Sequence, residues 1–540
     1  MQEDAPARLF SKGSIIALTK TQKSIVSGMT VLGLAGIICK LVGVMFTIPL
    51  TWLIGADGLG VYQTVFPTYN LLLTVSSAGL PVAVSRMVSH SLAKDDPRSA
   101  KRIFHVALCL LTALGLICTI LMLAGNSFLV ARVNEPQSSA GFYVIAPCLV
   151  IVCMLSAFRG FMQGQQNMTP TAISQLIEQV GKVFISLPLA YIGAQTSVAY
   201  GAAGALLGIT VVEAVALVYM IALYMRRRSA FAAIPQLADS APASAQSLAM
   251  QLTKISIPIT IGACIVPLSQ FVDSSMLLSR MVDAGIAQAE ALPLYGIFSG
   301  MVIKLINVPT ALALAVSMSL VPAISAAKAI NDDEGVRRQS DLGLRFAFLI
   351  GFPCSIGMSL LSKPILAFFY EETISAEHLQ IAGELLSVSS LTVVLFTVVQ
   401  ATSSILQGLQ KQRIPMYTLV VGVALKILLN YILVGTPGID IHGAPIASVV
   451  CYGASMLPNL YFVCKYTGLK CNWMGWIVRP GLATLAMGLT VWGMRELLPA
   501  GRFFTLLEIA VGVAVFIAAA IAVKAVTKND FRALRRRRKA

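Results

Sequence analysis

Four lysines lie inside long apolar stretches of this 540-residue chain: Lys40, Lys182, Lys304 and Lys426. A charged side chain at the centre of a bilayer costs about 2.5–3.5 kcal/mol, so each lysine must face a water-filled cavity or a charged partner. An ammonium group that faces a cavity is a compact point charge, which suits a phosphate group. The lysines therefore predict either a site for a phosphorylated substrate or a set of buried ion pairs.

The acids near each lysine bear on this choice. The stretches around Lys40 and Lys304 contain no acidic residue, so we expect both to face one cavity between two halves of the molecule. Glu178 precedes Lys182 by one helical turn, the favourable order, and forms either a structural ion pair or part of the function. Lys426 has no acid in its own stretch and is assigned a structural or gating role.

Two further acids, Glu213 and Asp273, also lie within apolar stretches. Asp273 is expected to pair with Lys304 or with Arg280. The alternative role for Lys40 is a buried ion pair with Asp273 or Glu213, because buried charges are usually paired. The predicted cavity residues are Lys40, Lys304, Asp273 and Arg86. The predicted structural or gating residues are Glu178, Lys182, Glu213, Lys426, Pro49 and Pro309, of which the prolines permit helices to bend.

The composition places these residues in a membrane. Hydrophobic residues make up 57% of the chain and charged residues only 12%, too few charges to cover a soluble protein of this size. Apolar stretches of about twenty residues, the length at which a helix spans a bilayer, recur along the chain. We predict an all-α polytopic membrane protein with about fourteen transmembrane helices. Their residues are 25–54, 62–90, 100–126, 140–163, 170–193, 199–225, 251–280, 293–326, 342–370, 379–407, 414–434, 443–465, 474–498 and 503–526.

The first 24 residues lack the apolar core and cleavage site of a signal peptide, so the first span is expected to act as an uncleaved signal. The ten cysteines are scattered and form no CxxC pair. We expect them to be small buried hydrophobic residues, and no metal site or other cofactor is predicted.

Lysine and arginine are distributed unequally between the two sides of this predicted bundle. The side of the termini holds most of them, including residues 94–102, 226–228, 328–338 and 524–539. The positive-inside rule therefore predicts that both termini are cytoplasmic. The net charge of +16 needs no nucleic-acid partner, and the basic tail at residues 535–539 is expected to lie against anionic lipid headgroups.

Two pairs of loops resemble each other at nearly the same separation along the chain. The sequence Gln-Gly-x-Gln occurs at residues 163–166 and again at 407–410, and residues 94–102 resemble 331–338. These echoes indicate a duplicated unit, although short basic loops also resemble one another by chance. We predict a cytoplasmic segment (1–24), an N-lobe (25–228), an inter-lobe linker (229–248), a C-lobe (249–465), two further spans (466–527) and a basic tail (528–540).

Motifs for common catalytic chemistry are missing from the sequence. It contains no GxxxxGK[ST] phosphate loop, no HExxH and no GxSxG, and it has only four histidines. We therefore expect that the protein is not an enzyme. Movement of a substrate would draw on an ion gradient, the membrane potential or downhill flux of the substrate itself.

Four segments resemble the stage V sporulation protein B and polysaccharide-biosynthesis flippases. These are residues 33–63, 79–86, 159–170 and 320–325. The resemblance covers nearly the whole chain and implies the multidrug/oligosaccharidyl-lipid/polysaccharide (MOP) exporter superfamily, whose fold has two lobes that alternate in access around a central cavity. The nearest functional relatives implied are the lipid II flippases of peptidoglycan synthesis.

The resemblance also implies a substrate and partners. Lys40 before Leu41-Val42-Gly43 matches a basic position of the lipid II flippases, whereas Phe46 and Thr74 stand where those proteins carry further cavity arginines. The implied function is a flippase for lipid II or a related undecaprenyl-pyrophosphate sugar in the bacterial cytoplasmic membrane. Membrane lipids and cell-wall synthesis proteins are the candidate partners.

Two other functions remain open from the sequence. An ion-coupled exporter of cationic drugs belongs to the same superfamily and would use acidic cavity residues such as Glu178, Glu213 or Asp273. A non-transporting scaffold for a wall-synthesis complex would leave the intramembrane charges without a role. A positive cavity favours the lipid-linked pyrophosphate.

Overall fold

The structure is a computed structural model that describes residues 12–94, 96–232, 244–499 and 501–525. Within these ranges the side chains of residues 12–38, 40, 41, 44, 227–232, 315 and 318 are left out of the description. The described chain is helical throughout, with no strand, and thirteen of its stretches are long and apolar enough to cross a membrane. This confirms the predicted all-α membrane fold.

The helices follow the predicted spans closely. The first group comprises α1 (Lys12–Ser77), α2 (Leu80–Leu92), α3 (Pro97–Ala124), α4 (Asn126–Val133), α5 (Ser139–Gly164), α6 (Thr169–Gly181), α7 (Leu187–Ala194) and α8 (Val198–Ala232). Next come α9 (Ala245–Asp283), α10 (Gln288–Gly296), α11 (Ile303–Ala329), α12 (Asp333–Leu360), α13 (Ser362–Tyr370), α14 (Ala376–Ser389), α15 (Leu391–Gly408), α16 (Arg413–Val434) and α17 (Gly443–Thr467). The last two are α18 (Arg479–Leu497) and α19 (Arg502–Ala522).

Short segments join or interrupt these helices. Two 3₁₀ turns are η1 (Pro136–Ser138) and η4 (Asp440–His442), and three π segments are η2 (Lys182–Ser186), η3 (Ile297–Val302) and η5 (Met474–Val478). The predicted first and second spans meet inside α1, which turns at Gly55 with φ 66°. Only glycine adopts that left-handed conformation freely. The candidate span at Met45–Leu92 therefore includes the end of the predicted first span and all of the second.

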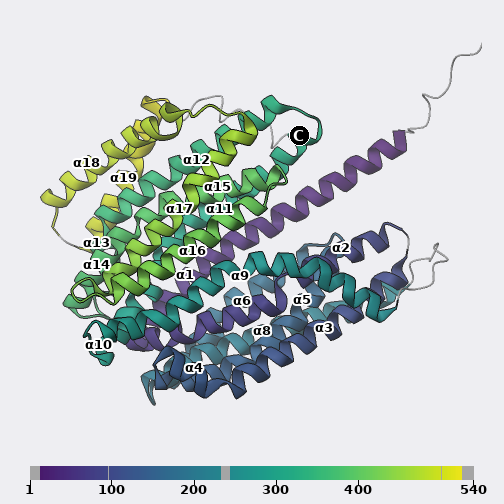
Figure 1. The fold of residues 1–540 in the computed structure, drawn as a ribbon, viewed down its shortest axis with the longest axis horizontal. Coiled ribbons are helices and arrows are strands. Elements are labelled where there is room, and N and C mark those ends of the chain that lie inside the picture. Colours follow the sequence, from purple (N-terminus) through teal and green to yellow (C-terminus); the bar gives the residue numbers. More distant parts are fainter. Residues whose placement is uncertain (1–11, 95, 233–243, 500, 526–540) are drawn as a thin grey trace, which may run out of the picture.

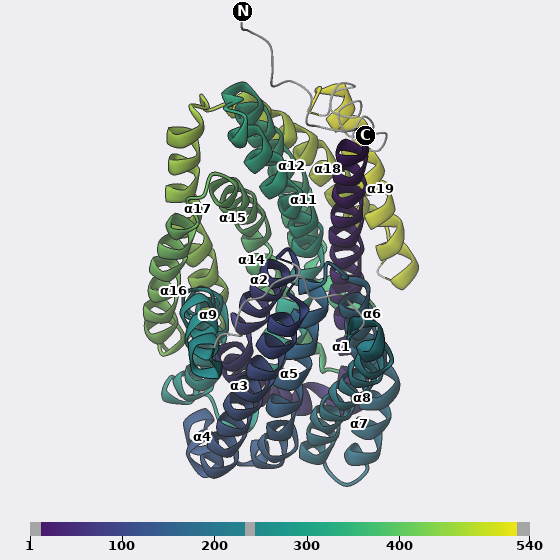
Figure 2. The same cartoon turned by 90° about the vertical axis from the view of Figure 1, so that its right-hand side faces the viewer.

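The helices pack in two groups with the same order of neighbours (Figures 1 and 2). In the first group α5 packs against α2, α3 and α8, while α7 packs against α8 and α1 against α6. In the second group α15 packs against α11, α12 and α17, while α16 packs against α17 and α9. Helices α18 and α19 pack against each other and α12. The repeated order supports the predicted duplication, and the boundaries of the two lobes stay a prediction.

The two Gln-Gly loops have the same backbone geometry. Gln166 and Gln410 both adopt positive φ, 57° and 61°, after the helix has ended. The amide of Asn167 donates to the Met162 carbonyl at 3.1 Å, and that of Lys411 donates to Leu406 at 2.8 Å. These bonds satisfy the last carbonyls of α5 and α15 in the same manner.

The acidic loops repeat in the same way. The side chain of Asp96 caps α3 by accepting from the amide of Ser99, and Asp332 caps α12 by accepting from Gly335. Each carboxylate satisfies an amide that the first helical turn leaves without an intrahelical partner. The resemblance between these loops thus reflects a shared helix-start chemistry in the two groups.

The hydrophobic core joins the two groups at both ends of the bundle, but more extensively at one. We call the end with the α2–α3 and α11–α12 connections the basic end. At the opposite end, which holds α4, α10 and α13, one apolar cluster joins α1 and α5 to α10, α13 and α14. Towards the basic end, the clusters around Phe104 and around Phe348 are separate. There, only α9 of the second group, through Leu248 and Leu252, belongs to the described cluster around Phe104.

Glycines allow the contact between the groups at the opposite end. A Cβ on Gly60 would overlap Leu292, and a Cβ on Gly296 would overlap the backbone of Ala56 and Gly60. Because both residues lack a side chain, α1 and α10 approach with their backbones nearly touching. The indole nitrogen of Trp52 adds a hydrogen bond to the Phe369 carbonyl at 2.7 Å. The bundle is therefore closed at the opposite end.

The orientation of the bundle is open to a direct test. Reporter fusions at Ala540 and near Asp239, both outside the described residues, are expected to report cytoplasm, because lysine and arginine concentrate at the basic end. Paired reporters, one active only in the cytoplasm and one only outside it, measure this at each site. An outside signal at either position would contradict the predicted orientation.

Candidate functional site

A cavity of about 360 Å³ lies where α1 of the first group meets the second group. Its walls come from α1, α9, α10, η3, α11, α15, α16 and α17. Its charged lining residues are Lys304, Lys426 and Asp273. Amide and aromatic side chains complete its wall, namely Gln63, Asn70, Gln270, Asn307, Phe66, Tyr295, Phe298, Phe396 and Tyr452.

Hydrogen bonds between the groups line this cavity. The phenol of Tyr295 donates to the Gln63 carbonyl at 3.1 Å, and the Gln63 amide nitrogen lies 3.4 Å from the Ser299 carbonyl. On the α9 side, the amide of Asn70 donates to that of Gln270 at 3.3 Å. These polar groups can bind hydroxyl and carbonyl groups of a ligand.

Lys304 lies in the cavity as the sequence predicts. It follows the π segment η3, whose wider turn shifts the register of the residues after it and so sets the face on which Lys304 lies. Its Nζ is 5.7 Å from the centre of the Phe66 ring. Within the described part of the chain no carboxylate lies within ion-pair distance of it, and Lys182 is near enough for the two positive charges to repel. Lys304 is thus a cation available to an anionic ligand.

Asp273 has a different partner from those predicted. It pairs with Lys426 of α16, and the Asn430 amide donates to its other oxygen at 2.8 Å. Arg280 pairs instead with Asp283, at 2.8 Å. The expected pairing of Asp273 with Lys304 or Arg280 is therefore wrong, because α16 carries a lysine into the same wall of the cavity.

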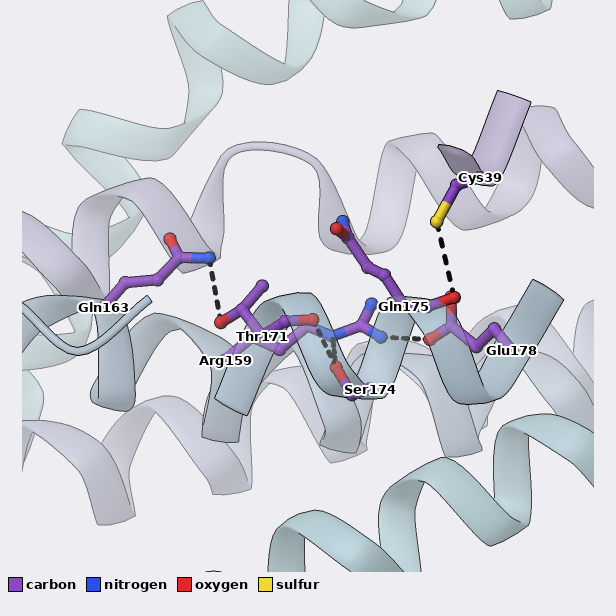
Figure 3. Close-up of polar contacts among 7 residues, drawn as sticks. All are labelled: Cys39, Arg159, Gln163, Thr171, Ser174, Gln175 and Glu178. Atoms are coloured by element: carbon purple, nitrogen blue, oxygen red, sulfur yellow. Dashed lines mark hydrogen bonds and ion pairs between the residues drawn. The ribbon is translucent and has the colours of Figure 1, made fainter. Parts of the chain in front are cut away.

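Glu178 also has a partner that the sequence analysis missed. Figure 3 shows Arg159 reaching from α5 to Ser174 and Glu178 on α6. Its Nε donates to the Ser174 hydroxyl at 2.9 Å, and its terminal nitrogen pairs with the Glu178 carboxylate. The expected pair of Glu178 with Lys182 is wrong, because α6 gives way at Lys182 to the π segment η2, while Arg159 approaches from α5.

The remaining predicted residues lie outside the cavity or outside the description. Glu213 is 6% exposed on α8, and its Oε2 has no hydrogen-bond partner among the described residues. Arg86 is exposed on α2 and is not one of the described residues that line the cavity. Pro49 lies within α1 and Pro309 within α11. Lys40 lies on α1, and its side chain is outside the described residues.

The bond nearest to Lys40 shows what this part of α1 contacts. The Sγ of Cys39 lies 3.5 Å from the Gln175 carbonyl of α6 (Figure 3), and a Cβ on Gly43 would contact the Gln179 side chain. This segment of α1 therefore packs against α6. The role of Lys40 in the cavity stays a prediction.

Known proteins with a similar sequence or fold give this site its context. The model of the polysaccharide biosynthesis protein family matches residues 25–328, and the MatE model matches residues 258–432. The chain is 27% identical to the lipid II flippase MurJ of Bacillus subtilis (strain 168) over 461 residues, which covers 82% of each protein. It is 25% identical to stage V sporulation protein B of the same organism, covering 79% of this chain and 81% of that one.

A solved structure supports the same assignment at the level of the fold. The inward closed conformation of lipid II flippase MurJ matches 91% of this chain and 97% of its own, with a TM-score of 0.69 and 13% identity. The family model covers more than half of the 540 residues. The chain therefore belongs to the polysaccharide biosynthesis protein family and is a multi-pass membrane transporter of the MOP superfamily.

Proposed function

We propose that this transporter flips a lipid-linked oligosaccharide across the membrane, either lipid II or a related undecaprenyl-pyrophosphate sugar. The observation that carries the proposal is Lys304, a lysine inside the cavity with no carboxylate partner among the described residues. Its attraction to a phosphate is stronger in a partly dehydrated cavity than in water. The relatedness to lipid II flippase MurJ points to the same substrate class.

The proposed mechanism uses the two-group architecture. The pyrophosphate would bind to Lys304, with Lys40 as the predicted second cation, while Asn70 and Gln270 of the cavity lining would bind the sugar. The cavity would open at the basic end, where the cluster around Phe104 is separate from the cluster around Phe348, and then at the opposite end after the groups rock. The substrate headgroup would cross without passing through lipid.

The test is depletion of the host's own flippase followed by complementation with this protein. Lipid II accessible on the outer leaflet is the readout. Restored accessibility of lipid II supports the proposal. If the protein reaches the membrane and lipid II does not become accessible, the proposal is contradicted.

Lys40 provides a prediction within the same assay. Lys40→Arg is expected to keep much of the activity, and Lys40→Ala to lose it at normal membrane abundance, because a phosphate needs the charge. If Lys40 instead pairs with a buried acid, Lys40→Ala should lower abundance, and removing the acid as well should restore it. Normal complementation by Lys40→Ala would contradict its role in binding.

A second candidate is an ion-coupled exporter of cationic drugs. Two observations favour it: Asp273 lines the cavity, and the MatE model matches residues 258–432. Against it, the carboxylate of Asp273 is neutralised by Lys426. Accumulation of a cationic dye in cells with and without the protein separates the two, since only the exporter lowers it.

A further inference from the structure

The ion pair of Lys426 and Asp273 lies in the wall of the cavity that holds Lys304. The side chains of the pair keep 16% and 15% of their surface accessible, so they are open to the cavity. The lining thus contains two ammonium groups and one carboxylate among the described residues. A diphosphate carries several negative charges, so Lys304 alone would leave it under-neutralised.

The pair also links two helices that have different neighbours in the bundle. Asp273 is on α9, which packs against α1, α2 and α3 as well as against α16, the helix of Lys426. Asp273 has a second donor in Asn430, whose own Oδ1 is buried and has no hydrogen-bond partner among the described residues. Asp273 therefore keeps one hydrogen bond if Lys426 leaves it.

We propose that Lys426 is a further contact for the diphosphate, beside Lys304 and the predicted Lys40, and that Asp273 competes with the substrate for it. This inference rests on the proposed function, because it takes the ligand to be a lipid diphosphate. When the anion enters, the flexible side chain of Lys426 exchanges the carboxylate of Asp273 for a phosphate oxygen. Asp273 stays bound to Asn430, and the ionic contact between α9 and α16 is released.

The competition makes the cavity selective. An empty cavity has Lys426 neutralised, so among the described lining residues weak anions meet one free cation, Lys304. A diphosphate has a second phosphate group to offer to Lys426 once the first is bound to Lys304. The attraction between Asp273 and Lys426 thus sets the strength of interaction that a ligand must exceed in order to bind Lys426.

Removing both charges of the pair tests the proposal. Affinity for farnesyl pyrophosphate is measured by calorimetry on the full-length protein in detergent. Lys426→Gln with Asp273→Asn leaves the net charge unchanged and no unpaired buried charge, so the variant should fold. We expect binding about tenfold weaker, because a charge-assisted contact to phosphate is lost. Unchanged affinity would overturn the proposal, since a merely structural pair contributes nothing to the anion.

A matched control lies on the same helix. Arg280→Gln with Asp283→Asn also removes an ion pair without a change in net charge, and neither residue is among the described residues that line the cavity. Its affinity for farnesyl pyrophosphate is expected to match that of the unmodified protein. An equal loss in the control would show that the effect is not specific to the cavity and would overturn the proposal.

Single variants separate the competitor from the contact. Asp273→Asn is expected to bind farnesyl pyrophosphate more tightly, and this gain should vanish when Lys426→Gln is also present. If Asp273→Asn still increases the affinity for farnesyl pyrophosphate when Lys426→Gln is present, Asp273 acts only by electrostatic repulsion of the anion. That result would overturn the proposed exchange. If Asp273→Asn does not fold, the affinity of the double variant for farnesyl pyrophosphate still tests the proposal.

Two further ligands and one variant distinguish the possible failures. Farnesyl monophosphate should lose less affinity than farnesyl pyrophosphate in the double variant, because it has no second phosphate group to offer to Lys426. A loss seen with inorganic pyrophosphate but not with farnesyl pyrophosphate would overturn the assignment to a lipid. If Lys304→Gln leaves farnesyl pyrophosphate binding intact, the proposed function itself fails. If only the Lys426 and Asp273 variants are without effect, the exchange alone fails.

Discussion

Replacing Lys304 with glutamine is expected to abolish transport of the lipid-linked substrate. Glutamine keeps most of the length of the side chain and removes its charge, so the cavity loses the cation that no described carboxylate neutralises. A charge-assisted contact contributes roughly 1.5–3 kcal/mol, which corresponds to at least about a tenfold loss. Lipid II accessible on the outer leaflet, measured in flippase-depleted cells, is the readout.

Two companion variants make this result specific. Lys304→Arg should retain much of the activity, because the guanidinium also binds phosphate. Lys254→Gln removes an exposed lysine of α9 outside the cavity and should leave transport unchanged. Full activity of Lys304→Gln at normal abundance would remove the main support for a phosphate ligand. It would also favour the scaffold or the drug exporter.

Replacing Arg159 with alanine is expected to have the largest effect on stability. The change leaves the carboxylate of Glu178 buried without its cation, and it also removes the hydrogen bond to Ser174. Glu213 is buried nearby with an unsatisfied oxygen, so a second acid adds to the penalty. Loss of one partner of a buried ion pair costs about 3–5 kcal/mol. We expect a clear fall in membrane abundance and in the temperature of unfolding in detergent.

Removing the acid as well provides the control. Arg159→Gln with Glu178→Gln removes both charges of the pair, so neither is left without its partner, and much of the lost abundance should return. Arg159→Lys should recover only part, since one ammonium cannot reproduce the two directed contacts to Ser174 and Glu178. Normal abundance of Arg159→Ala would contradict a stabilising role for the pair.

The sequence was sufficient for the membrane fold but insufficient for the ion pairs. Long apolar stretches predict helices directly, because a lipid environment allows few other structures. Lys304 was also placed correctly in a cavity, since its stretch offers no acid. The pairing of Glu178 followed the rule for residues one turn apart, and it failed because a helix distant in sequence supplied Arg159.

Lys426 illustrates what sequence reasoning lacked. Its partner lies 153 residues away in the chain, on α9, and nothing in the spacing indicates that α9 and α16 are neighbours. Only Asn430, one turn after Lys426, hinted at a polar patch on that face of α16. The aromatic and amide lining of the cavity was likewise invisible, because such residues are common along all the spans.

In the proposed rocking mechanism, the close approach of Gly60 and Gly296 has a consequence for the populations of the two states. An added methyl group at either position would overlap backbone only while α1 and α10 are in contact, as they are here. In a state with this end open, the same methyl group would meet no obstacle. Such a substitution therefore acts like a ligand with unequal affinity for two conformations, and it moves the equilibrium toward the open one. The size of one side chain can thus change the fraction of time that the protein spends in each state, without altering the cavity.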